Sequence, residues 1–263
     1  MRIATWNLWW RFGPWAERQK AVLAVLHDLR PDVVGLQEVW AEGDDNLAGW
    51  LADELDMHWT WAPSPASDRW QRRIGRTGVE IGNAVLSRWP LVERDVLHLP
   101  APEDVDDGRI ALYARVAAPG HQVPFFSAHL TSHHTASAIR CRQVTALAGF
   151  VAAHRGRTDF PPVVTGDFNA GPDSDEIRLF RGADTFSDAW DQADPSAPSA
   201  TLDHANPYNG PSHGPGARVD YIHIGTDASG LGTVRRAWRA GDGPVDGVWP
   251  SDHAAVAADL RVW

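Results

Sequence analysis

The sequence predicts an α/β protein in which two mixed β-sheets pack face to face with helices outside. Each half of the 263-residue chain reads as a strand, a helix and then several strands, and this order suits two sheets with helices on their outer faces. No linker divides the chain and no short repeat occurs, so we expect one domain over residues 1–263. With 43% hydrophobic and 22% charged residues, the chain can bury the core that this fold needs.

The first half of the chain supplies most of the predicted strands. Apolar runs and apolar alternation predict strands, whereas apolar residues three and four positions apart predict helices. We expect strands at 2–9, 33–36, 58–62, 80–87, 91–98, 109–117 and 122–130, and helices at 16–29 and 44–55. Residues 63–79 are rich in Pro, Ser, Arg and Gly without periodicity, which predicts a loop.

The second half returns to helices and strands around one long polar segment. Thr135 is the expected N-cap of a helix that runs to about residue 154. A second helix is expected at 174–181, and strands at 162–165, 218–224, 232–238 and 254–261. Residues 191–217 are rich in Pro, Ser, Asn and Gly and exceed a simple turn. Loops of this length are often functional.

The net charge of the chain makes some classes of binding partner unfavourable. The formal net charge is −10, which argues against a protein that binds duplex nucleic acid through many Lys and Arg contacts. One local patch is basic, because Arg69, Arg72, Arg73 and Arg76 fall within eight residues. The net charge alone therefore does not decide against nucleic acid, because a local patch can bind it within an acidic protein.

Two absences bear on the expected location of the protein. Cys141 is the only cysteine, so the chain can form neither an internal disulfide nor a thiolate-rich zinc site. No stretch approaches eighteen consecutive apolar residues, which excludes a membrane-spanning helix, and the N-terminus lacks the apolar core of a signal peptide. We expect a cytoplasmic monomer.

The first candidate for chemistry is a carboxylate and an amide at the end of a predicted strand. Gly166-Asp167-Phe168-Asn169 directly follows the apolar run 161–165. In extended backbone Asp167 and Asn169 point to the same side, where they could hold a metal ion or a water and donate to a phosphoryl oxygen. The alternative is an Asx turn that closes the strand, and this motif alone does not decide between the two.

A second candidate lies near the C-terminus. In Ser251-Asp252-His253, the histidine titrates near neutral pH and suits acid–base chemistry, while the neighbouring carboxylate suits a metal ion. The motif precedes an apolar strand at 254–260. Its alternative is a polar cap on the loop before that strand.

Asp220 is a carboxylate inside the otherwise apolar strand 218–224. Burying it without a partner would be costly. A histidine is the natural partner, because a carboxylate can orient an imidazole as it does in a catalytic triad. The alternative is an ion pair with Arg218 in the same strand.

Three further polar residues occupy strand ends or strand interiors: Asn7, Glu38 and His129. Each could be an ordinary surface residue or a hydrogen-bonding partner of the backbone. Taken together with the other candidates, they form a set of carboxylates and amides without cysteine, which suits a hard cation such as Mg²⁺ or Mn²⁺. The two histidines, His129 and His253, add acid–base capacity. Such a set is what attack of water on phosphorus requires.

The motifs together resemble the endonuclease/exonuclease/phosphatase superfamily, whose members include deoxyribonucleases, apurinic endonucleases, sphingomyelinases and inositol polyphosphate phosphatases. The matching motifs are Thr5-Trp6-Asn7, Gln37-Glu38-Val39, Gly82-Asn83-Ala84-Val85-Leu86-Ser87-Arg88, Ala128-His129-Leu130, Gly166-Asp167-Phe168-Asn169, Arg218-Val219-Asp220-Tyr221-Ile222 and Ser251-Asp252-His253. They keep the family's order and span nearly the whole chain. The resemblance implies a four-layer α/β/β/α sandwich and a metal-dependent phosphoester hydrolase.

The resemblance also implies roles for the polar residues. Glu38 would be the main metal ligand, with Asn7 and Asp252 nearby. Asp167 would hold or activate the attacking water, or bind a second metal ion.

The remaining implied roles concern the phosphate and the leaving group. Asn169 would stabilise the transition state. His253, oriented by Asp220, would contact the phosphate or act as the base, and His129 would be an acid near the leaving group.

Substrate contacts are expected from Arg109, Asn83 and Thr201. Trp9 stands where apurinic endonucleases carry an aspartate, so the resemblance to that branch is weaker. The acidic charge favours a small phosphoester or a lipid headgroup over duplex nucleic acid. The alternatives are an endonuclease or exonuclease that acts on DNA or RNA, and a non-catalytic binding protein with the same fold.

Overall fold

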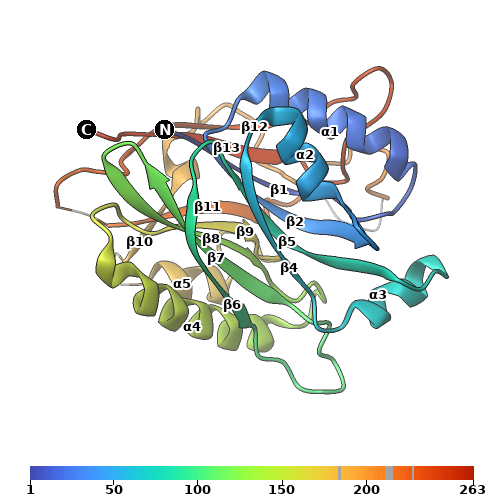
Figure 1. Ribbon diagram of the computed structural model, residues 1–263. Helices are drawn as coiled ribbons and strands as arrows, with labels where there is room; N and C mark the ends of the chain where they lie inside the picture. The colour runs from blue at the N-terminus through green and yellow to red at the C-terminus, as the bar shows by residue number, and fades with distance from the viewer. Residues whose placement is uncertain (183–184, 211–215, 227) are drawn as a thin grey trace.

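Two mixed β-sheets lie face to face at the centre of the protein, with helices on both outer faces (Figure 1). The computed structural model describes residues 1–182, 185–210, 216–226 and 228–263. The predicted α/β/β/α sandwich is confirmed. No helix in these described ranges is long and apolar enough to cross a membrane.

The first sheet, sheet A, joins strands from both ends of the chain. Its order is β12-β13-β1-β2-β5-β4, with β3 paired to β2. The strands are β1 (Arg2–Asn7), β2 (Val33–Glu42), β3 (Asp45–Asn46), β4 (His58–Pro63), β5 (Val79–Ser87), β12 (Val234–Ala240) and β13 (Ala255–Leu260). Strands β1 and β2 run parallel, and β1 also pairs antiparallel with β13.

The second sheet, sheet B, comes from the middle of the chain. Its order is β10-β11-β9-β8-β7-β6. The strands are β6 (Leu91–His98), β7 (Ile110–Ala118), β8 (His121–His129), β9 (Val163–Asp167), β10 (Phe186–Asp188) and β11 (Asp220–Gly225). Strands β8 and β9 run parallel, whereas β11 pairs antiparallel with β9. The short strand β10 was not predicted.

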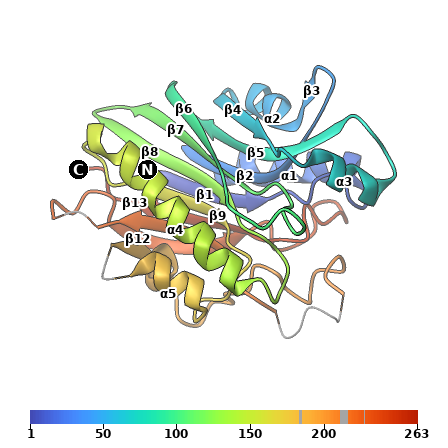
Figure 2. The ribbon, with the colours of Figure 1, turned by 90° about the horizontal axis from the view of Figure 1, so that it is seen from below.

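Three apolar cores separate the four layers. Helices α1 (Trp15–Leu29) and α2 (Leu47–Leu55) cover the outer face of sheet A. The helices α4 (Ser137–His154) and α5 (Asp175–Arg181) cover sheet B on the other side (Figure 2). The middle core lies between the two sheets and contains inward-facing residues of both. Residues alternate between cores along a strand, as a period of two requires.

Close approach of the two sheets depends on small residues and on buried polar contacts. A Cβ atom at Gly35 would lie 2.3 Å from Oγ1 of Thr165 in the opposite sheet. Beside this point, Nε2 of Gln37 donates to Oγ of Ser127 at 3.0 Å. These contacts lock the middle strands of one sheet against those of the other.

Residues 63–79 contradict the loop prediction, because α3 occupies Ser67–Ile74. Trp70 is buried on its inner side, and Ile74 follows one turn later in the same core. The arginines between them are good helix formers, so the helix forms around one aromatic anchor that periodicity over a short segment does not reveal.

The structure differs from the predicted cap of one helix and agrees with the predicted start of another. The prediction that Thr135 caps α4 is wrong, because the N-cap is Ala136 and no side chain caps it. Ser174 does cap α5, and its oxygen accepts from the Ile177 amide. The long segment 191–217 contains the end of a short 3-10 helix, η2 (Ala189–Gln192). Residues 211–215 of this segment lie outside the described part of the chain.

His223 of β11 should make stability depend on pH. Its ring is buried among Phe168, Phe180 and Tyr221, and within the described part of the chain neither ring nitrogen has a hydrogen-bond partner. Burial lowers its pKa from 6.5 to about 4. The unfolded chain therefore takes up this proton first, and stability is lost as the pH falls below 6.5 towards 4. Between pH 7 and pH 5 the loss from this residue is about 2 kcal/mol.

Urea unfolding of the wild type and of His223→Phe at both pH values measures this contribution. The phenylalanine variant should lose about 2 kcal/mol less than the wild type over the same interval. His27→Gln removes an exposed histidine of α1 and serves as the control. Equal pH dependence of the wild type and His223→Phe would contradict the assignment.

Candidate functional site

The strand register of both sheets brings the predicted polar residues to one end of the sandwich. In sheet A, Asn7 pairs with Gln37 at the end of the parallel β1–β2 ladder. In sheet B, His129 pairs with Asp167 at the end of the parallel β8–β9 ladder, and Asp220 pairs with Asp167 from the other side. Because the sheets face each other, these side chains meet in the space between them.

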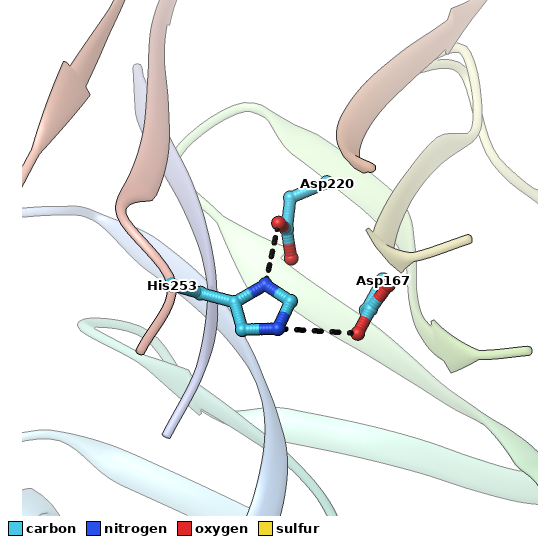
Figure 3. Close-up of side chains that lie close together, drawn as sticks. All are labelled: Asp167, Asp220 and His253. Atoms are coloured by element: carbon cyan, nitrogen blue, oxygen red, sulfur yellow. Dashed lines mark hydrogen bonds and ion pairs between the residues drawn. The ribbon is translucent and has the colours of Figure 1, made fainter. Parts of the chain in front are cut away.

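Asp220, His253 and Asp167 form a buried row (Figure 3). Nδ1 of His253 lies 2.8 Å from Oδ2 of Asp220, and its Nε2 lies 3.8 Å from Oδ2 of Asp167. A histidine is therefore the partner of Asp220. The alternative partner, Arg218, binds Asp188 instead at 2.7 Å.

Surrounding carboxylates keep His253 charged. Burial alone would lower the pKa of His253, but Asp220, Asp252 and Asp167 together raise it well above its usual value. Burial also opposes ionisation of Asp167, yet His129 and His253 hold the pKa of that carboxyl well below its usual value. The row thus contains an imidazolium between two carboxylates.

Asp167 is held in place by three neighbours. Nδ2 of Asn7 donates to its Oδ2 at 3.0 Å, and Nε2 of His129 lies 3.3 Å from the same oxygen. Its Oδ1 accepts from the backbone N–H of Asn169 at 2.9 Å, where Asn169 adopts a φ of 50°. The Asx turn considered for this motif is therefore present, and it aims the carboxylate into the site. Nδ2 of Asn169 donates to the carbonyl of Leu130 at 3.0 Å.

Gly166 is required beside this carboxylate. It adopts a φ of 149°, and a Cβ atom there would lie 1.9 Å from the carbonyl oxygen of Ala128 on β8. Any side chain would push β9 away from β8 and move Asp167 with it.

His129 connects Asp167 to Arg109. Nη1 of Arg109 lies 2.8 Å from Nδ1 and 2.6 Å from Nε2 of His129, while its Nε donates to Asp107 at 2.7 Å. Burial and the positive charge of Arg109 lower the pKa of His129. The ring is therefore neutral at pH 7, and a tautomer with hydrogen on Nε2 can face Asp167 while Nδ1 accepts from Arg109.

Glu38 is a buried carboxylate to which the Asn7 side chain hydrogen-bonds, but one of its oxygens is unsatisfied among the described residues. A register shift between Leu36 and Val39 forms a bulge in β2, and Glu38 adopts a φ of 53° there. Such bulges turn a side chain out of the strand alternation. Oε2 of Glu38 is buried without a hydrogen bond, and burial raises the pKa of Glu38. Among the described residues, no cationic side chain forms an ion pair with it.

Asp252 faces the same space from the other end of the chain. Burial, with a contribution from the charge of Glu38, raises the pKa of Asp252 to about 6. Two carboxylates that disfavour each other's ionisation are arranged as for a bound cation. Their oxygens, with the amide of Asn7, form the donor set that Mg²⁺ or Mn²⁺ prefers, so these residues fit the metal ion expected from the sequence.

Asp167, Asp220 and His253 also place one ligand atom each within 4.8 Å of one another. We assign this group to acid–base and hydrogen-bonding roles rather than to the main metal site. Nδ1 of His253 already faces Asp220, and a charged imidazolium has no lone pair for a metal ion. Asp167 stands at the boundary and can serve both groups.

Two of the residues expected to contact substrate make internal contacts. Nδ2 of Asn83 donates to the carbonyls of Ile110 and Ser127, so it bridges the sheets beside the site. Oγ1 of Thr201 accepts from the amides of Val219 and Asp220. In this structure Thr201 therefore positions the start of β11.

Sequence reasoning missed Arg18, a buried guanidinium of α1. All of its hydrogen bonds go to backbone carbonyls, namely those of Leu8, Trp9, Trp10, Phe12 and Pro250. It thereby ties the turn after Asn7 to the segment before Asp252. A signal was present, because Arg18 stands four residues before Val22 on the apolar face of the predicted helix.

The long segment 191–217 supplies two further missed residues. Nδ2 of Asn206 donates to the carbonyl of Ser251, and Nδ2 of Asn209 donates to that of Asp252, both at 2.7 Å. These bonds hold the backbone that carries Asp252. No spacing in the sequence connects them to a strand end more than forty residues away.

Replacing Arg18 by methionine should destabilise the protein by at least ~3 kcal/mol, because several buried carbonyls lose their donor at once. Calorimetric melting measures the effect, with Lys20→Met on the exposed side of α1 as the matched control. Arg18→Lys should also be destabilised, since an ammonium cannot reach this many carbonyls. A lysine variant as stable as the wild type would show that charge alone matters.

Comparison with known proteins adds two findings. A sequence model described as the endonuclease/exonuclease/phosphatase family matches residues 4–253. No curated protein sequence matches the chain significantly.

Solved structures of this fold align over the full chain. TDP2 of D. rerio, complexed with single strand DNA product, has a TM-score of 0.79 at 19% identity and covers 100% of this chain and 99% of its own. The human Nocturnin catalytic domain, with bound sulfate anion, has a TM-score of 0.73 at 20% identity, with coverage of 99% and 94%. An endonuclease/exonuclease/phosphatase protein from Beutenbergia cavernae has a TM-score of 0.76 at 23% identity, with coverage of 100% and 71%. At these identities the likeness concerns the fold.

Proposed function

The chain belongs to the endonuclease/exonuclease/phosphatase family, and we propose that it is a divalent-metal-dependent hydrolase of phosphoester bonds. Members of this family are typically hydrolases of phosphoesters and generally use divalent metals. The observation that carries the proposal is the buried carboxylate of Glu38, whose Oε2 has no hydrogen bond among the described residues and whose charge adds to the effect of burial that raises the pKa of Asp252. Burial of a carboxylate with an unsatisfied oxygen is costly, and a bound cation would offset this cost.

In this proposal Glu38, Asp252 and Asn7 hold the metal ion, with Asp167 at the edge of the site. A bound Mg²⁺ or Mn²⁺ supplies positive charge to a phosphoryl oxygen and so favours attack on phosphorus. Trp9 donates its backbone N–H to Oδ1 of Asn7 at 2.9 Å, which fixes the amide.

Asp167 orients the attacking water, and His253 binds the phosphate. The ionised carboxylate of Asp167 accepts a hydrogen bond from the water and receives its proton as the new P–O bond forms. His253 stays charged because Asp220 faces its Nδ1, so its Nε2–H can donate to a phosphoryl oxygen. The geometry therefore favours His253 as a phosphate ligand over His253 as the base.

The opposite side of the phosphate is served by Asn169, Arg109 and His129. Charge that develops on the phosphoryl oxygens is stabilised by N–H donors that are already in position, and the Arg109 guanidinium is fixed by Asp107 and Ser132. The neutral ring of His129 has one N–H, which faces Asp167 in this structure; with substrate bound, we assign it to a hydrogen bond that stabilises the leaving oxygen, which departs as an anion when its P–O bond breaks.

The proposed substrate is a small phosphoester or a lipid headgroup rather than duplex nucleic acid. A net charge of −10 opposes the tracking of a duplex. Trp59 on β4 is 42% exposed, whereas Trp70 on α3 is buried. Of these two tryptophans, Trp59 is therefore the one that would reach a lipid surface. The alternative is hydrolysis of single strands, which a cleft beside α3 favours.

A substrate screen tests the activity. With Mg²⁺ or Mn²⁺ the protein should hydrolyse at least one member of a panel that holds plasmid DNA, single strands, sphingomyelin, inositol phosphates and sugar phosphates, and EDTA should abolish this. Asp167→Asn should then lower kcat at least ~10²-fold, the usual scale for a group that acts in the transition state.

Asp175→Asn is the matched control for that variant, since Asp175 is exposed in the first turn of α5. Its kcat should equal that of the wild type. A folded Asp167→Asn protein with less than a tenfold loss would remove Asp167 from the reaction, and a protein inactive on the whole panel would contradict the proposed function.

Thermal melting tests the metal site without any substrate. In EDTA, Glu38→Gln should melt above the wild type, because the raised pKa of Glu38 means that its charge destabilises the metal-free fold. Free Mg²⁺ at ten times its dissociation constant should stabilise the wild type by about 1.4 kcal/mol. The glutamine variant should show little of this gain. An equal Mg²⁺ shift in both proteins would exclude Glu38 as a ligand.

A further inference from the structure

A cleft of about 590 Å³ opens beside the candidate site, between α3 and the segment 131–139. Its walls include three arginines of α3 and the buried Trp70. The sequence alone connected this arginine patch to no other candidate residue. The structure places it next to the residues proposed to act on phosphate.

The cleft adjoins the site. A narrow pocket lined by Glu38, Arg109 and His129 shares Trp70 and Asp107 with the cleft. At this junction the Arg109 guanidinium lies 4.9 Å from the Trp70 ring. Arg109 thus stands between the candidate site and the cleft.

Arg73 is the free cation of this cleft. It is exposed, and its guanidinium lies over the Trp70 ring at 4.5 Å. No carboxylate among the described residues forms an ion pair with it. Arg72 pairs with Asp68 at 2.9 Å, but both side chains are exposed, so this pair is weak and easily exchanged.

The remaining charges of the cleft are satisfied within the protein. Arg69 donates to the carbonyls of Asp104 and Asp106 and so builds the rim. Asp107 is the carboxylate of the wall, and Arg109 neutralises it at 2.7 Å. The cleft is thus positive inside a protein of net charge −10.

We propose that this cleft binds a second phosphate group of the substrate, through Arg73 and Arg72, while the first phosphate lies at Arg109. The inference rests on the proposed function for that first phosphate. A guanidinium presents paired N–H donors that match phosphate oxygens, and the Trp70 ring holds Arg73 in place. The second phosphate can come from the next residue of a single strand or from a bisphosphorylated small molecule.

Calorimetric titration in EDTA tests the inference without catalysis. One pair of ligands is adenosine 5′-monophosphate and adenosine 3′,5′-bisphosphate, and the other is a thymidine dinucleotide without and with a 5′-phosphate. In at least one pair the extra phosphate should tighten binding about tenfold, as one charge-assisted hydrogen-bonding group provides. Arg73→Ala should bring the ratio of dissociation constants close to one.

Arg235→Ala is the matched control, since Arg235 is an exposed arginine of β12 at the far edge of sheet A. It should leave the ratio at its wild-type value. The pair that shows the preference identifies the source of the phosphate. A wild-type ratio near one in both pairs, or a ratio that Arg73→Ala leaves unchanged, overturns the inference.

Hydrolysis of bis(p-nitrophenyl) phosphate with Mg²⁺, which has one phosphate, separates this inference from the proposed function. Arg73-dependent binding without any hydrolysis of this compound or of the substrate panel would retain the cleft and contradict the function. Hydrolysis of this compound without a preference for the second phosphate would support the proposed function and overturn the inference about the cleft.

Discussion

The parallel pairing of β1 with β2 and of β8 with β9 is the constraint on which the rest of the site depends. Each pair ends in register, so that Asn7 lies beside Gln37 and His129 beside Asp167. A slip of one residue in either ladder would turn every side chain of that strand to the opposite face. The face-to-face packing then brings the two ladder ends together, and β11 adds Asp220 from its first residue.

The charges at these strand ends are arranged so that most neighbours neutralise each other. A carboxylate, an imidazolium and a second carboxylate follow one another from Asp220 through His253 to Asp167, and a neutral imidazole and a guanidinium continue the row. Glu38 lies outside this row and keeps an unsatisfied oxygen. Burial of that kind persists in folded proteins chiefly where function requires it, which is why the geometry supports a bound cation there.

Much of the fold followed from local patterns. Strand and helix periods placed nearly every long element within one to three residues, because a helix buries one regular face in a single core and a strand buries alternate residues in the cores on its two sides. Helix α3 was not predicted, because one buried residue, Trp70, anchors it in place of a periodic apolar face. The strand β2 also continues beyond the predicted run through the bulge at Glu38, and a bulge has no periodic signal.

The candidate site could be assembled from the sequence only in part. Strand-end positions indicated Asp167, Asp220 and His253, because polar groups at the ends of apolar runs need a reason to be there. The residues that position the backbone were invisible, since Arg18, Asn206 and Asn209 act on carbonyls far away in the sequence. Their partners are set by loop conformation, which local propensity does not encode.

The pairing of β1 with β13 has a consequence for the order in which the protein becomes competent. Residues Arg2–Thr5 hydrogen-bond in register with Val256–Asp259, so β1 cannot complete its pairing until β13, which is synthesised much later, is available. Trp6 likewise donates to the carbonyl of His253. A nascent chain that has exposed Asn7, Glu38 and even Asp167 still lacks the strand that fixes their geometry. The proposed catalytic arrangement therefore forms only when β13 completes its pairing with β1 in sheet A.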